Sequence, residues 1–492
     1  MSIIRTAGAA LVAGALAVPA AAQPTGITIA MALEPPNLDP TAGAAAAIDE
    51  VVYANVFEGL TRFDRDGAIR PALAREWELS DDGTVYTFHL AEGVTFHDGA
   101  AMTAGDVVFS LNRARGADSV NAQKQLFSGI ESVEAVDAAT VRVTLSAPDG
   151  SFLFKLAWGD AVIVDPATAA TLATNPVGTG PFAFEEWVRG DRVELTRNSD
   201  YWGEEAALER ATFRFIPDPN AAVAAMMAGD IDAYPNFPAP ETLSRFEATP
   251  RFDVMVGSTE GETILSTNNA RPPLDDPRVR EAIAHAIDRE AIIDGAMFGY
   301  GTPIGTHFAP HHPDYVDLRA EFSAHDPAQA RALLEEAGAT DLTLDLALPP
   351  PSYARRGGQI VASQLRGVGI ATEIINMEWA QWLEQVFRGK DYDLTIVSHT
   401  EPMDIAVYAR PDYYFNYDNP EFRALMDELS RTTDPEARSA MLEEAQRIIA
   451  ADHVNGYLFQ LARTGVANAD IEGLWENAPT QANDLTEVRW SR

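Results

Sequence analysis

The stretch from Leu342 to Ile375 constrains the fold of this chain more than any other part of the sequence. Its hydrophobic pattern predicts a strand over 342–348, a helix over 356–366 and a second strand over 370–375. A strand, a helix and a strand in this order form a βαβ unit, whose two strands are parallel. The sequence therefore predicts an α/β protein that contains a parallel sheet.

The next elements indicate where such a sheet binds its ligand. The pattern predicts a helix over 379–388 and a strand over 393–397, and the carboxyl end of this strand opens into the loop 399–404. In open α/β sheets, ligands bind at the carboxyl ends of the strands. The loop 399–404 is therefore a candidate part of a binding site.

Three Asp-Pro pairs mark helix starts, because aspartate caps the first turn and proline is pre-set for it. The pairs begin at Asp276, Asp326 and Asp434. Thr103 and Asp106 have the spacing of a further cap.

The first residues have the pattern of a secretory signal peptide. Arg5 precedes an apolar run over 7–18, and the small residues Ala20 to Ala22 follow it, so we expect the mature protein to begin near Gln23. The apolar run is shorter than the roughly 20 residues that cross a bilayer. The chain has no cysteine, which excludes a lipid anchor on cysteine, disulfides and thiolate metal ligands. We expect a periplasmic protein that is not lipid-anchored.

Length and charge limit the organisation and the partners. At 492 residues the chain is long enough for about three compact units. Its net charge of -37 disfavours nucleic acid and anionic lipid as partners. This net charge does not fix the sign of any single pocket, so local residues must indicate the ligand.

Motifs along nearly the whole mature chain resemble the extracellular solute-binding proteins of peptide and nickel ABC importers, called family 5. The most specific motif is the run from Pro71 to Val108, which includes Phe96-His97-Asp98-Gly99. The other matching segments occur in the family's order, and they are 36–40, 55–60, 178–182, 198–203, 229–232 and 268–288.

The resemblance implies an α/β fold of two lobes joined by a hinge, with an extra subdomain in the first lobe. We expect a first lobe of residues 23–62, 181–266 and 460–492, an extra subdomain over 63–180 and a second lobe over 267–459, with the hinge near 265–268 and 457–461. It also implies that the protein closes over a small-molecule or peptide ligand and presents it to the membrane permease of an ABC importer. We expect a monomer without a cofactor.

Residues 354–374 are most similar to the dipeptide-binding branch of this family. The resemblance implies that Arg355 or Arg356 binds a peptide carboxylate, since a guanidinium can hold a carboxylate with two hydrogen bonds. The branch's amine-binding acid falls on Glu401, and Asp404 matches a second acid. A short peptide or another zwitterion is therefore the expected ligand. The alternative is that these charges are ordinary surface residues.

Aromatic residues and glycine loops complete the expected site. The branch commonly has Gly-Trp where this chain has Val397-Ser398, and Tyr413 is a candidate replacement for the missing indole. Trp379 is a further candidate for the cleft wall, although core packing is the commoner role for such residues. The resemblance also implies that the loops around Phe57 and Gly178 approach the ligand.

Two rival functions remain open at this point. His307, His311 and His312 could converge on a metal ion if the turn at Pro310 brought them together, although no strongly spaced acid or cysteine completes the set, and we assign no metal site. A secreted hydrolase is disfavoured because the chain has neither a Gly-x-Ser-x-Gly elbow nor a His-Glu-x-x-His helix. Glycosides, opines and metal chelates remain alternative ligands, because the fold does not select among them.

Overall fold

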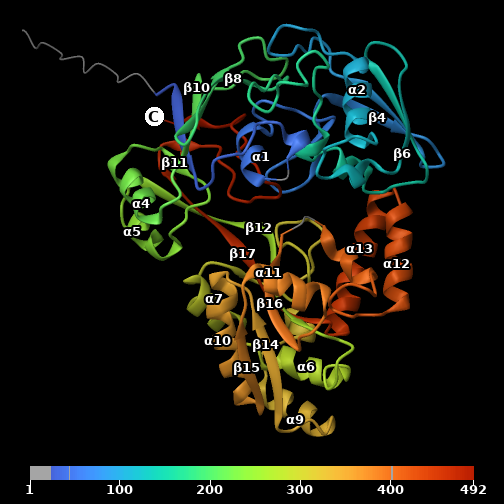
Figure 1. Cartoon of the computed structure of the whole chain (residues 1–492), viewed down its shortest axis with the longest axis vertical. Coiled ribbons are helices and arrows are strands. Elements are labelled where there is room, and N and C mark those ends of the chain that lie inside the picture. Colours follow the sequence, from blue (N-terminus) through green and yellow to red (C-terminus); the bar gives the residue numbers. More distant parts are fainter. Residues whose placement is uncertain (1–23, 44, 401–402, 492) are drawn as a thin grey trace, which may run out of the picture.

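The computed structural model describes residues 24–43, 45–400 and 403–491, and it consists of an upper body and a smaller lower lobe (Figure 1). The predicted signal segment and Glu401 lie outside these residues. Within the described residues one 11-stranded mixed sheet runs through both parts. Its path is β15 (Ile370–Asn376), β14 (Leu342–Leu348), β16 (Leu394–His399), β12 (Phe252–Thr267), β17 (Asn455–Asn468), β11 (Ala233–Tyr234), β1 (Gly26–Met31), β10 (Arg210–Phe215), β9 (Arg192–Arg197) and β8 (Phe182–Val188), with β13 (Thr302–Pro303) paired to β17.

Two long antiparallel strands, β12 and β17, connect the two parts (Figure 1). Their pairing runs from Phe252 opposite Asn468 to Ser266 opposite Asn455, and it shifts register between Ser258 and Glu262. Residues 262–267 of β12 also pair with β16 of the lower lobe. The irregular stretch 258–262 therefore lies where β12 passes from one part to the other.

The lower lobe contains the predicted βαβ unit. Strands β14 and β15 are parallel, and helix α10 (Ser352–Gly367) connects them and packs on β15. It packs also on α7 (Arg289–Met297), while α6 (Pro277–Ala286) packs on α9 (Pro327–Glu336). The three predicted aspartate caps are confirmed: Asp276, Asp326 and Asp434 each accept a hydrogen bond from a backbone N–H of the first helical turn. Helix α10 begins four residues before the predicted start.

A four-stranded antiparallel sheet forms a separate layer of the upper body. Its order is β4 (Ala74–Leu79), β5 (Val85–Leu90), β7 (Thr140–Leu145) and β6 (Ile130–Ala135), and α2 (Ala104–Arg115) packs on it. The predicted cap of α2 is confirmed as a capping box of Thr103 and Asp106. Tyr86 and Phe88 of β5 are buried in a hydrophobic core that belongs to this layer. All of this layer falls within the range 63–180.

The remaining elements connect or flank these layers. Trp490 at the end of the described chain donates a hydrogen bond to the backbone oxygen of Gly26, so the two ends meet on the upper body. No helix in the described part of the chain has the length and hydrophobicity needed to span a membrane.

The elements that connect or flank the layers described above are α1 (Ala46–Val52), β2 (Thr61–Phe63), β3 (Ile69–Pro71), α3 (Phe152–Lys155), α4 (Pro219–Ala228), α5 (Leu243–Glu247), α8 (Arg319–Phe322), α11 (Trp379–Trp382), α12 (Pro420–Arg431), α13 (Pro435–Ala451), β18 (Ile471–Glu472), β19 (Arg489–Trp490), the π-helix η5 (Leu383–Arg388) and the 3-10 helices η1 (Pro40–Ala42), η2 (Lys124–Phe127), η3 (Gly159–Ala161), η4 (Pro240–Thr242) and η6 (Asp404–Ala409).

Candidate ligand site between the lobes

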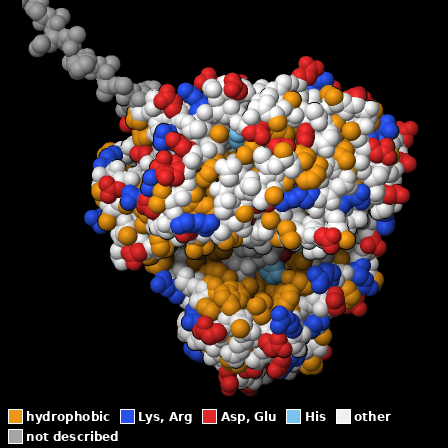
Figure 2. All heavy atoms as spheres, turned by 45° about the horizontal axis from the view of Figure 1, so that its top comes forward, with side chains coloured by type: hydrophobic (Ala, Val, Ile, Leu, Met, Phe, Trp, Pro, Cys, Tyr) orange, Lys and Arg blue, Asp and Glu red, His pale blue; other side chains and the backbone are white. Residues whose placement is uncertain are grey.

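A cavity of about 510 Å³ lies where the two connecting strands leave the upper body. Its wall combines residues 30–34 and 45–47 of the upper body with residues 259–261 of β12, residues 461–463 of β17 and Thr400, which follows β16. The space-filling view shows a hollow between the upper body and the lower lobe, with hydrophobic side chains gathered on its lower wall (Figure 2). The volume is within the usual range for a small-molecule site, roughly 300–1,000 Å³.

The charged side chains among the described lining residues are Glu34, Glu50, Glu260 and Arg463. Arg463 is buried, and this burial lowers its pKa to about 10. Its two terminal nitrogens donate to the backbone oxygens of Trp475, Asn477 and Ala482 and to Oδ1 of Asn483. Because these donors point to protein acceptors, the glutamates dominate the charge that the described wall offers to a ligand.

Glu34 and Glu260 are held by polar groups of the protein. Glu34 accepts hydrogen bonds from Nε1 of Trp187 and from a backbone N–H, and Oε1 of Glu260 lies 2.7 Å from Nε2 of His311. Burial raises the pKa of Glu50, and the nearby Arg463 opposes this rise. A cationic ligand group would relieve the cost of burying these carboxylates.

Arg355 and Arg356 lie in the first turns of α10, after the carboxyl end of β14. Nη2 of Arg355 donates to the backbone oxygen of Met377 and to Oε1 of Glu378, at 3.1 and 3.3 Å, and its Nε is buried without a hydrogen-bond partner. Arg356 is exposed and lies over the ring of Phe298. Neither arginine lines the cavity between the lobes.

The predicted aromatic residues belong to one cluster near the start of α11. Trp379 is 40 % exposed and meets Trp382 edge to face, whereas Trp382 is buried and donates its indole N–H to Thr395. Tyr413 packs edge to face on the half-exposed Phe387. Trp379 is thus the more accessible of the two tryptophans.

Asp404 is engaged by two histidines. Its Oδ1 lies 2.7 Å from Nε2 of His307, and its Oδ2 lies 3.0 Å from Nδ1 of His399. Burial opposes the negative charge, but the attraction and hydrogen bonds of the two histidines hold the pKa of Asp404 well below its ordinary value. Both carboxylate oxygens therefore already have partners. His311 and His312 do not join this group, because His312 lies nearest to Asp314 and His311 contacts Glu260.

Phe57 and Gly178 contribute to packing in the upper body. Phe57 is fully buried in its core. A Cβ at Gly178 would lie 2.0 Å from the backbone oxygen of Val56, so only glycine allows this approach. Neither residue is part of the cavity wall, and the loops around them meet each other instead of the ligand cavity.

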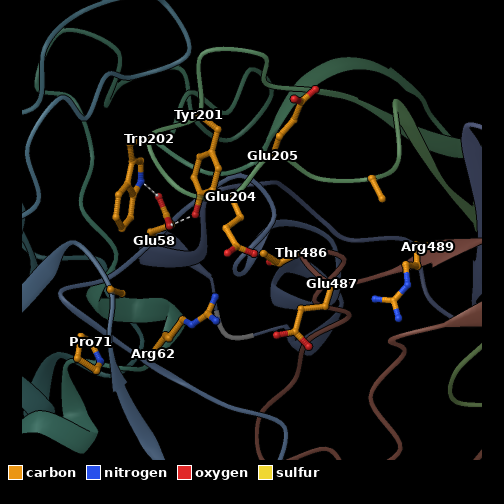
Figure 3. Close-up of a pocket in the computed structure, with 12 residues that line it drawn as sticks. Glu58, Arg62, Pro71, Tyr201, Trp202, Glu204, Glu205, Thr486, Glu487 and Arg489 are labelled. Atoms are coloured by element: carbon orange, nitrogen blue, oxygen red, sulfur yellow. Dashed lines mark hydrogen bonds between the residues drawn. The ribbon is translucent and has the colours of Figure 1, made fainter.

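The same loops build a buried network around Glu58. Its carboxylate accepts hydrogen bonds from Tyr201 and Trp202 (Figure 3) and from Thr179. Glu58 and its donors come from three separate motifs of the sequence, 55–60, 178–182 and 198–203. Glu58 and both aromatic residues line a second cavity of about 560 Å³ on the upper body. These motifs therefore meet in one network that holds the upper body together.

Sequence reasoning missed Glu34, Glu50 and Glu260 as cavity residues. For Glu260 we find one sequence signal: Glu260 and Glu262 are two acids at alternate positions of one long strand. The position of Glu260 in the wall depends on the register shift at 258–262, which depends on pairing with residues about 200 positions away.

Two parts connected by paired strands, with a cavity at the crossing, define the class of two-lobed solute-binding proteins. The fold agrees with HbpA2 from Haemophilus parasuis (TM-score 0.87, 24% identity, 94% of this chain and 99% of that chain) and with the unliganded open form of the murein tripeptide binding protein MppA (TM-score 0.85, 23% identity, 96% and 98%).

Residues 68–421 match the family described as "Bacterial extracellular solute-binding proteins, family 5 Middle", and the chain belongs to this family. The glutathione-binding protein GsiB of Pectobacterium atrosepticum is 31% identical over 443 residues, which cover 85% of both chains. The dipeptide-binding protein of Escherichia coli is 30% identical over 352 residues, 65% of each chain.

Proposed function

We propose that this protein is the exported, periplasmic solute-binding component of an ABC importer and that it captures a short peptide or an amino-acid-like zwitterion. One observation carries this proposal: a cavity of about 510 Å³ lies where the paired strands β12 and β17 of the main sheet connect the two parts. Family membership supports the same function, as does the reported binding of glutathione and dipeptides by the two relatives.

The hinge is proposed at residues 258–262 of β12 and 460–462 of β17, where the pairing of the two strands is irregular. Irregular pairing leaves fewer hydrogen bonds to break when the strands bend. The predicted hinge at 265–268 lies beside it, where β12 is already paired to β16. With this hinge, residues 263–266 are proposed to belong to the second lobe, and the other ranges of the first lobe, extra subdomain and second lobe stay as predicted from the sequence.

The ligand's amine is proposed to bind the acidic wall formed by Glu34, Glu50 and Glu260. Glu401 is retained as an additional acid because of its place in the sequence, next to the lining residue Thr400. Asp404 is no longer proposed as a ligand contact, because His307 and His399 occupy both of its oxygens.

The ligand's carboxylate is proposed to bind Arg355, whose buried Nε lacks a protein partner. Its side chain is 40% exposed and ion-paired to Glu378, which is 81% exposed. Closure of the lobes would let a ligand carboxylate replace this exposed glutamate as the partner of the guanidinium.

A binding screen tests the function directly. Mass spectrometry of the solute released from freshly purified protein identifies the ligand class, and thermal shift with peptides and amino acids then measures its binding. We expect an increase of several degrees with one class and recovery of that ligand unchanged. Turnover of the ligand by the pure protein would contradict the proposal.

Charge-removing variants test the binding mode. Glu260→Gln is expected to weaken an amine-bearing ligand about tenfold, because a hydrogen bond to a charged group contributes roughly 1.5–3 kcal/mol. The affinity for the N-acetylated ligand, which lacks the charged amine, should change little in the same variant. Glu131→Gln, at an exposed position of β6, is the matched control. Unchanged affinity in Glu260→Gln and Arg355→Ala would reject the proposed contacts.

A further inference from the structure

Two segments that are far apart in the sequence bring two histidines and one aspartate together at the end of β16. His399 is the last residue of β16, Asp404 begins η6, and His307 follows β13. One ligand atom from each of the three lies within 4.8 Å of the others. His307 is 1% and His399 7% exposed, so these polar groups are gathered in the protein interior.

The outer nitrogen of each imidazole is fixed by a tyrosine. The hydroxyl of Tyr408 lies 3.1 Å from Nδ1 of His307, and the hydroxyl of Tyr414 lies 3.0 Å from Nε2 of His399. Asn455 in turn donates to the hydroxyl of Tyr408. Histidines that bind metals have this arrangement, with one nitrogen facing the ion and the other hydrogen-bonded to an orienting group.

The charge around the three residues also favours a cation. His307 and Asp404 share a cavity of about 10 Å³ with Glu260 and Glu262 of β12. A water molecule needs a cavity of roughly 10–15 Å³, so the cavity has room for about one small ligand. Three carboxylates thus surround it, while the basic groups among its described lining residues are histidines.

We propose that His307, His399 and Asp404 hold a resident divalent cation, most closely Zn²⁺ in its chemistry, separate from the transported solute. Two imidazoles and one carboxylate are a regular zinc ligand set, and water from the small cavity supplies the fourth ligand. When the ion binds, each neutral imidazole changes tautomer. Its proton then lies on the nitrogen that faces the tyrosine, and the lone pair of the other nitrogen faces the ion. The tautomer change releases no proton, and the ion replaces the two hydrogen bonds to Asp404.

Zinc titration of the untagged, EDTA-treated and dialysed protein tests this site. Calorimetry with ZnCl₂ is expected to show one equivalent bound with submicromolar affinity, and Co²⁺ should give the visible spectrum of a four-coordinate site. Asp404→Asn and His399→Gln should each weaken Zn²⁺ at least about 100-fold. His325→Gln is the matched control, because that histidine is 41% exposed and belongs to a different contact.

A second variant keeps the test decisive if Asp404→Asn or His399→Gln folds poorly by circular dichroism. Tyr414→Phe removes only the hydroxyl that orients His399 and is expected to weaken Zn²⁺ about tenfold. Absence of stoichiometric Zn²⁺ binding to the wild-type protein would overturn the proposal. Equal affinity in the wild type, Asp404→Asn and Tyr414→Phe would also overturn it, since the ion would then bind elsewhere.

Discussion

The Glu58 network permits a quantitative prediction for the upper body. Thr179 is fully buried, and its hydroxyl donates to Oε2 of Glu58 at 2.8 Å. Thr179→Val nearly preserves the shape of the side chain and removes this donor. A hydrogen bond to a charged group contributes roughly 1.5–3 kcal/mol, so we expect the variant to lose about 2 kcal/mol in free energy of unfolding.

A double-mutant cycle separates this bond from other effects of the substitution. In the Glu58→Gln background the acceptor is neutral, and a neutral hydrogen bond contributes about 1 kcal/mol. Thr179→Val should therefore cost about 1 kcal/mol less in that background than in the wild type. Thr171→Val, at an exposed hydroxyl, is the control, with an expected change below about 0.5 kcal/mol.

Urea unfolding at pH 8, followed by tryptophan fluorescence and by circular dichroism, measures these differences. The two probes must give coincident transitions, because a chain of several units need not unfold in one step. A loss below about 0.5 kcal/mol for Thr179→Val, or an equal loss in both backgrounds, would refute the argument that a charged carboxylate is held by this hydroxyl.

Three further predictions concern acid stability, close packing and the cleft. Burial lowers the pKa of His453 to about 4, so the unfolded chain binds one more proton between pH 6.5 and 4 and stability falls as the pH falls through this window. Between pH 7 and 4.5, the free energy of unfolding measured in urea should fall by about 2 kcal/mol less in His453→Gln than in the wild type. Identical pH dependence of the two proteins would contradict this. Gly178→Ala should cost about 3 kcal/mol through its clash with Val56, whereas Gly129→Ala, with open space around its Cβ, should cost less than about 1 kcal/mol in the same assay. Trp379, which the sequence predicts for the cleft wall, is 40% exposed, so Trp379→Ala should weaken solute binding measured by calorimetry while the thermal midpoint changes by less than about 3 °C; unchanged affinity would contradict the predicted role of Trp379.

The amino-acid sequence alone determined the local structure and the family. The cap of an aspartate and the fixed backbone of the following proline act within one turn, so the starts at Asp276, Asp326 and Asp434 could be predicted from the sequence. The βαβ unit was predictable for the same reason, because its hydrophobic period reflects neighbours close in the chain. The ordered motifs also indicated the family that the comparison later showed.

Only the tertiary structure decided what the polar residues contact. Asp404 has the sequence position of a ligand-binding acid, but His307, 97 positions away, and His399 take both of its oxygens. Glu260 enters the cavity wall through a register shift set by a distant strand. A short hydrophobic pattern specifies which face of an element is buried, whereas the partner of a buried charge depends on how distant segments pack, because each such charge must find its compensating group in three dimensions.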